Sequence, residues 1–162
     1  MKEPEFWKIV EKVRLSTDEI YERPGKLAQS LDGITHDEIR DFAEIYLDLV
    51  ARAYTWPLWG AAFVISGGCS DDAFDYFRDW LISEGKEVYA RALEDPESLA
   101  DLEHIEEPEL EEFRYVAEEV YEKKTGKTLE FRERQFSFEP SGEAWDEDTV
   151  DKMFPKLAEK YW

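Results

Sequence analysis

The chain has 162 residues, a length typical of one domain, and a formal net charge of −20 from 40 acidic and 20 basic side chains. This charge repels nucleic-acid phosphates and anionic membranes, so we expect neither as a partner, whereas a basic protein would be attracted. The single cysteine excludes an intramolecular disulfide bond.

Helical periodicity governs the N-terminal part of the chain. An amphipathic helix is predicted near the start, with Phe6, Val10 and Val13 on its buried face. We expect Pro24 to break the chain after this helix, and a short helix to follow over residues 26–34.

The sequence THDE at residues 35–38 fits a capping box, in which Thr35 is the N-cap and Glu38 lies three residues later. The run that follows, IRDFAEIYLDLVARAY, repeats apolar residues at helical spacing. It predicts a long amphipathic helix.

Residues 57–83 are expected to form two helices that meet at a pair of glycines. Pro57 suits the first turn of a helix that is apolar on all sides, and such a helix should be central and buried. Gly67 can end that helix with a positive φ angle, and Ser70 can cap the next one, DDAFDYFRDWLIS. In this interpretation GGCSDD is a C-cap followed by an N-cap.

The rest of the chain is also predicted to be mainly helical. One helix stops before Pro96, a long helix begins at Pro108 and is capped by Gly126, and the C-terminal helical segment is broken at Pro155. Residues 128–139 alternate only loosely, so we expect a short extended arm or a minor β element there. The predicted fold is a mostly α, orthogonal helical bundle in a single domain over residues 1–162.

The sequence offers no sign of secretion or membrane insertion. The start, MKEPEFWKIVEK, is charged throughout, and the longest apolar run, PLWGAAFVI, is too short to span a bilayer. We therefore expect a cytoplasmic protein without a membrane partner.

Three stretches carry a family resemblance: FW near the start, then WPLWGAAFVISGGCSDDAFDYFRDWLISEGKEVYARALEDPESLAD, and then GEAWDEDTVDKMFPKLAEKYW. Together they resemble the bacterial domain of unknown function 4240. The resemblance runs over nearly the whole chain and implies one intact domain. It implies no activity and supplies no catalytic residues.

The junction of the two central helices holds the candidate ligand-binding residues, which are Trp56, Trp59, Cys69, Ser70, Asp72 and Arg78. A helix N-terminus can lower a thiol pKa, but the aspartates of the same turn would raise it, so a packed, unreactive Cys69 is the favoured interpretation. Arg78 would act as an anion clamp in a tryptophan-lined pocket, or form a structural ion pair with Asp75 or Asp72, or stack on a tryptophan. We favour a structural role for it.

No metal or cofactor is expected, because neither His36 nor His104 has the spacing of a metal-binding motif. Two classes of function remain. The favoured one is a non-enzymatic acidic interaction protein, with a regulatory or immunity-like role toward a basic partner. The alternative is a small-molecule-binding protein or enzyme with its site at the 56–80 junction.

Overall fold

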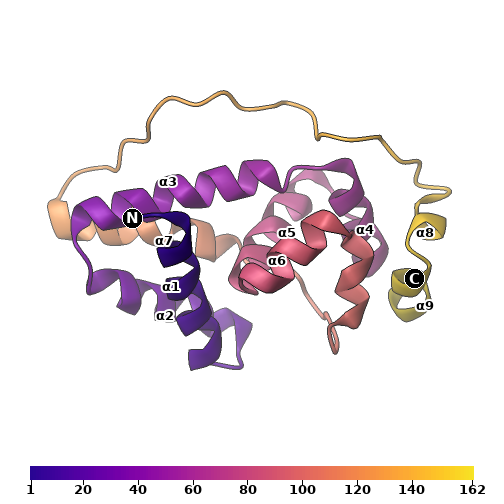
Figure 1. The fold of residues 1–162 in the computed structure, drawn as a ribbon, viewed down its shortest axis with the longest axis horizontal. Helices are drawn as coiled ribbons and strands as arrows, with labels where there is room; N and C mark the ends of the chain where they lie inside the picture. The colour runs from indigo at the N-terminus through magenta and orange to yellow at the C-terminus, as the bar shows by residue number, and fades with distance from the viewer.

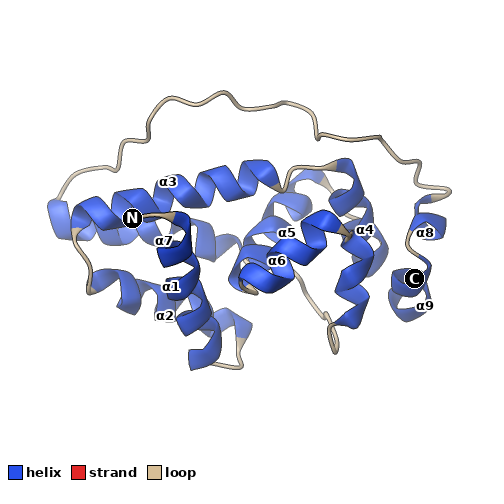
Figure 2. Ribbon diagram, viewed as in Figure 1, coloured by secondary structure: helices blue, strands red, loops and turns tan.

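The computed structural model describes all 162 residues, and it consists of helices joined by turns and one long arm (Figures 1 and 2). The α-helices are α1 (Glu3–Ser16), α2 (Arg23–Asp32), α3 (His36–Arg52), α4 (Trp56–Ser66), α5 (Asp71–Ser83), α6 (Lys86–Glu94), α7 (Glu111–Thr125), α8 (Val150–Met153) and α9 (Pro155–Tyr161). Two 3₁₀ helices, η1 (Ile20–Glu22) and η2 (Pro96–Asp101), join them. The mostly helical bundle predicted from the sequence is confirmed. None of the helices has the length and apolar character needed to cross a membrane.

The predicted N-caps and C-cap are present, but the capping box at residues 35–38 is only half formed, because the Glu38 carboxylate accepts from the Thr35 hydroxyl at 3.1 Å and not from the Thr35 amide. The Thr35 hydroxyl accepts a hydrogen bond from the Glu38 amide at 3.2 Å, which begins α3. The Ser70 hydroxyl accepts from the Ala73 amide at 3.2 Å, which begins α5. Gly67 ends α4 with a φ of 68°, a left-handed conformation that glycine adopts without steric penalty.

Two boundaries differ from the prediction. Pro24 does not break the chain but lies in the first turn of α2, where its missing amide proton is not needed. The helix expected to begin at Pro108 begins at Glu111 instead. The segment just before it is tied to α5, because the Leu110 amide donates to the Tyr76 carbonyl of α5 at 3.1 Å.

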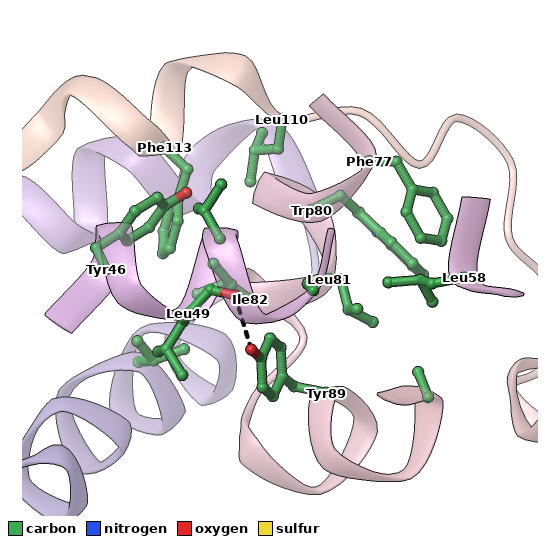
Figure 3. Packing of buried hydrophobic residues seen from close by; sticks show 14 of the residues in the cluster. Tyr46, Leu49, Leu58, Phe77, Trp80, Leu81, Ile82, Tyr89, Leu110 and Phe113 are labelled. Atoms are coloured by element: carbon green, nitrogen blue, oxygen red, sulfur yellow. Dashed lines mark hydrogen bonds between the residues drawn. The ribbon is translucent and has the colours of Figure 1, made fainter. Parts of the chain in front are cut away.

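The hydrophobic core lies where α3, α5 and α7 meet (Figure 3). The Tyr46 ring of α3 packs against the Phe113 ring of α7 with 6.2 Å between centroids, and the Tyr89 hydroxyl of α6 donates to the Leu49 carbonyl at 2.7 Å. From Phe77 to its last residue, α5 is buried on every side. α5 therefore occupies the central position, and the prediction that the apolar helix α4 would do so is wrong.

α4 lies instead at the end of the molecule that α8 and α9 cover (Figure 1). Its small residues explain this packing. Gly60 gives room to two aromatic rings, since a Cβ there would lie 3.0 Å from atoms of both Phe154 and Trp145. The C-terminal segment thus packs on a face of α4 that would otherwise expose apolar surface.

Residues 127–149 form a long arm that runs along one side of the molecule from α7 past α3 to α8, and the extended arm predicted at residues 128–139 is part of it (Figure 1). The Arg132 amide donates to Glu44 at 2.7 Å, and the Arg134 guanidinium lies 3.2 Å from the Asp48 carboxylate. No strand forms at 128–139, so the minor β element is not present. The one bridge lies further on, between Thr55 and Ser141.

Candidate functional site

The six candidate residues lie on two sides of the α4–α5 junction. Ser70 is occupied as the helix cap, and Asp72 is exposed in the first turn of α5, where its charge suits the helix dipole. Trp56 and Trp59 lie on α4 and are half-buried. These four residues therefore perform the structural roles of a cap, a first-turn acid and an aromatic surface.

The tryptophans form part of a stack. Trp56 and Trp59 are parallel at 5.3 Å between ring centroids, and Trp59 is parallel to Phe74 at 5.2 Å. Trp145 meets both tryptophans edge-on, and its indole N–H donates to the Trp56 carbonyl at 2.7 Å. The stack holds the end of the arm against α4.

Cys69 is half-buried beside this stack. The Trp59 indole N–H donates to the Cys69 carbonyl at 2.9 Å. Burial raises the pKa of the Cys69 thiol to about 12, and the charge of Glu109 adds to the effect. The thiol is therefore protonated at neutral pH, and the thiolate needed for nucleophilic chemistry is suppressed.

Arg78 is held in a structural network with one side facing a cavity. Its side chain donates to the Val50 carbonyl at 2.9 Å and pairs with Asp75. Its guanidinium lies 4.6 Å from the Tyr54 ring centroid and 5.0 Å from that of Phe74. The aromatic partners are thus a tyrosine and a phenylalanine rather than a tryptophan, and the carboxylate partner is Asp75 rather than Asp72.

The sequence reasoning missed a buried charged cluster behind Arg78. Asp79 is 0% exposed, and one of its carboxylate oxygens accepts hydrogen bonds from the Tyr46 hydroxyl at 2.7 Å and from the Arg114 guanidinium at 2.9 Å. Burial raises the pKa of Asp79 to about 6, although the Arg114 charge opposes that change. The second carboxylate oxygen has no partner, so this cluster is incompletely satisfied.

The amino-acid sequence gives only a weak indication of this charged cluster. Asp79 lies between Arg78 and Trp80 in a helix whose neighbouring positions are largely aromatic, so its side chain had to face either solvent or a partner. Its partners come from residues 33 and 35 positions away in the chain. Only the packing of α3 and α7 on α5 brings them together.

A cavity of about 380 Å³ opens beside this cluster. One wall comes from α3 and the turn after it and consists of Leu47, Val50, Ala51 and Tyr54. Another wall comes from Phe136 to Phe138 of the arm. The charged residues that line it are Asp71, Asp75, Arg78 and Arg114. Arg78 is therefore the only member of the predicted set that reaches the cavity.

A comparison with curated proteins and one with solved structures gave no match. One family model matches residues 1–123, from the start of the chain nearly to the end of α7. The match includes the α4–α5 junction and Arg114, whereas the arm, α8 and α9 lie beyond it. Because the match spans well over half of the chain, the chain belongs to the family described as protein of unknown function (DUF4240).

Proposed function

We propose that residues 1–162 act as one domain, a non-enzymatic acidic interaction protein of the bacterial cytoplasm that binds a basic protein in a regulatory or immunity-like role. This proposal rests on a surface where two exposed tyrosines, Tyr21 and Tyr115, and the half-buried Tyr76 lie among carboxylates. We call it the acidic face; it consists of Tyr21, Asp72, Tyr76, Glu106, Glu107, Glu109, Glu111, Glu112 and Tyr115.

Each tyrosine of the acidic face lies next to carboxylates. The Tyr21 hydroxyl donates to Glu107 at 2.7 Å, and the Tyr115 hydroxyl donates to Glu111 at 3.1 Å. Both hydrogen bonds raise the pKa of the phenol concerned. The pKa of Tyr76 is raised mainly by the charge of Glu111. The three rings thus lie in one negative field.

This arrangement suits the chemistry of a basic protein surface. Carboxylates attract lysine and arginine over long range and accelerate encounter, while tyrosine faces bind guanidinium groups by cation–π contact. Tyrosine is also enriched at protein interfaces. Nucleic acids and anionic membranes would be repelled by the same field. The raised pKa of Cys69 argues against thiol catalysis and so supports a binding role.

The test compares two variants of equal charge. The first carries Glu107→Gln, Glu111→Gln and Glu112→Gln on the acidic face. The second carries Glu130→Gln, Glu143→Gln and Glu147→Gln, and all three of these glutamates are exposed on the arm. Glutamine still accepts the tyrosine hydrogen bonds, so the fold is preserved in both.

Immobilised wild-type chain should retain a basic protein at low salt and release it at high salt, because exposed charges are screened within about 8 Å at physiological ionic strength. The acidic-face variant should lose this protein, and the arm variant should keep it. Recovery of no basic protein at either salt concentration would overturn the proposal. Equal loss in both variants would show that net charge alone, and not the acidic face, holds the partner.

A further inference from the structure

The cavity beside Arg78 has the size and wall chemistry of a small-molecule site. Its volume of about 380 Å³ lies within the range of roughly 300 to 1,000 Å³ that ligand pockets occupy. One wall is apolar and comes from Leu47, Val50 and Ala51 of α3. The opposite side carries charges of both signs. This site is separate from the acidic face and does not depend on it.

The two arginines retain donors for a ligand. A guanidinium has five N–H groups. Arg78 directs donors to the Val50 and Phe74 carbonyls and to Asp75, while Arg114 directs donors to Asp79 and to the Asp75 carbonyl. Each therefore keeps unused N–H groups. The Arg114 side chain is 22% exposed, which gives its unused donors access to the cavity.

Both arginines are also fixed before any ligand arrives. Arg78 is 5% exposed and stacks over Tyr54, and Arg114 is anchored by the buried carboxylate of Asp79. A group held in this way loses little conformational entropy when it binds. The pair thus forms a rigid, forked donor surface suited to a carboxylate.

The two carboxylates that line the cavity, Asp71 and Asp75, both come from α5. Asp71 is exposed in the first turn of α5, and the Asp75 side chain, one turn later, is 40% exposed while it pairs with Arg78. Two cations and two anions therefore line the cavity, which leaves it formally neutral. A purely anionic ligand would compete with Asp75 and meet the field of a chain with charge −20, and a purely cationic ligand would meet two arginines.

A zwitterion satisfies both sets of charges at once. We propose that this cavity binds a free α-amino acid with an apolar side chain. The ligand carboxylate accepts hydrogen bonds from Arg114 and Arg78, and its ammonium group pairs with Asp71 and Asp75. The apolar side chain of the ligand lies along α3 and is covered by Phe138 of the arm, whose side chain is otherwise 96% exposed.

The probes are L-leucine and L-phenylalanine, measured by calorimetric titration of the full chain. Two half-ligands separate the charges: 3-phenylpropanoate lacks the ammonium group, and phenethylamine lacks the carboxylate. We expect saturable binding of at least one amino acid, and an affinity about 10-fold or more weaker for each half-ligand, equal to about 1.4 kcal/mol per charged group.

Two substitutions at exposed positions test the location without touching the core. Asp71→Asn removes one carboxylate, and Ala51→Phe fills the cavity from the α3 side; both should weaken binding about 10-fold or more. The matched controls are Asp32→Asn on α2 and Ala90→Phe on α6, both exposed and outside the cavity, and these should bind as the wild type does.

Three results would each overturn the proposal. The first is the absence of binding by both amino acids. The second is equal binding by a half-ligand, which would show that only one charge is recognised. The third is an equal loss of binding in the control variants, which would place the ligand elsewhere.

Discussion

Replacing Arg114 with methionine tests the central claim about the buried cluster, namely that Asp79 is a charged group that depends on one cation. Methionine keeps the apolar length of the arginine stem but removes the guanidinium that donates to Asp79 at 2.9 Å. The Tyr46 hydroxyl remains, so one hydrogen bond to the carboxylate persists. The variant therefore isolates the effect of the charge.

The expected loss of stability is large. Removing one partner of a buried ion pair typically costs about 3–5 kcal/mol, because the other charge stays buried without compensation. Burial already raises the pKa of Asp79 from 3.8 to about 6 with Arg114 in place. At about 1.36 kcal/mol for each pKa unit, this rise corresponds to about 3 kcal/mol that burial of the ionised carboxylate already costs in the wild type. Without Arg114 the pKa of Asp79 must rise further.

The pH dependence follows from the direction of this shift. A carboxyl group whose pKa is higher in the folded state binds its proton more tightly when folded, so stability falls as pH rises from about 4 through the folded value. The Asp79 contribution is therefore least favourable above pH 6 in the wild type. In Arg114→Met the stability continues to fall at higher pH, because the pKa of Asp79 is higher without Arg114. The variant should lose less stability at pH 5 than at pH 8.

The stability loss at pH 5 and at pH 8 is measured by urea denaturation, with tryptophan fluorescence and circular dichroism as the two probes of unfolding. Arg91→Met is the control, because Arg91 pairs with Asp101 on the surface and such a pair is worth about 1 kcal/mol or less. Adding Asp79→Asn to Arg114→Met should restore most of the lost stability. A loss in Arg114→Met that is below about 1 kcal/mol, or one that is equal at pH 5 and pH 8, would refute the reasoning.

Three further predictions concern the α4–α5 junction and the segment that covers it. Cys69 should react with an alkylating reagent only above about pH 10 in the native protein, and a rate that already levels off near pH 8.5 would contradict the raised thiol pKa. Gly60→Ala should loosen the C-terminal segment by pushing on Phe154 and Trp145, and limited proteolysis would show faster cleavage of the arm if this is correct. Gly67→Ala should destabilise the fold by about 1–2 kcal/mol in urea denaturation, because its φ of 68° is strained for any residue with a Cβ.

The helix caps could be predicted because their chemistry is local. Thr35 and Ser70 each satisfy an amide three residues away, and Gly67 ends a helix through its own backbone freedom. The same is true of the Arg78–Asp75 pair, which lies within a single turn of α5. Local spacing was sufficient in each of these cases.

The tertiary partners could not be predicted in this way. Asp79 depends on residues from two other helices, and the arm is held by an ion pair between Arg134 and Glu44, which are 90 positions apart. Periodicity shows that a polar residue lies on a mostly apolar helix, but it does not show which distant residue will satisfy it. The cavity was missed for the same reason, because α3, α5, α7 and the arm all contribute to its walls.

The location of Arg114 suggests why a buried charged cluster is present at all. An ion pair of this kind often contributes no net stability compared with apolar residues of similar volume. The buried carboxylate does hold the Arg114 guanidinium at the cavity wall. The triple variant Tyr46→Phe, Asp79→Leu and Arg114→Met separates the two roles, since it replaces every polar side chain of the cluster and leaves no partner unsatisfied. We expect it to unfold at the same urea concentration as the wild type or higher, and to lose amino acid binding. A loss of several kcal/mol would instead assign the cluster to the stability of the fold.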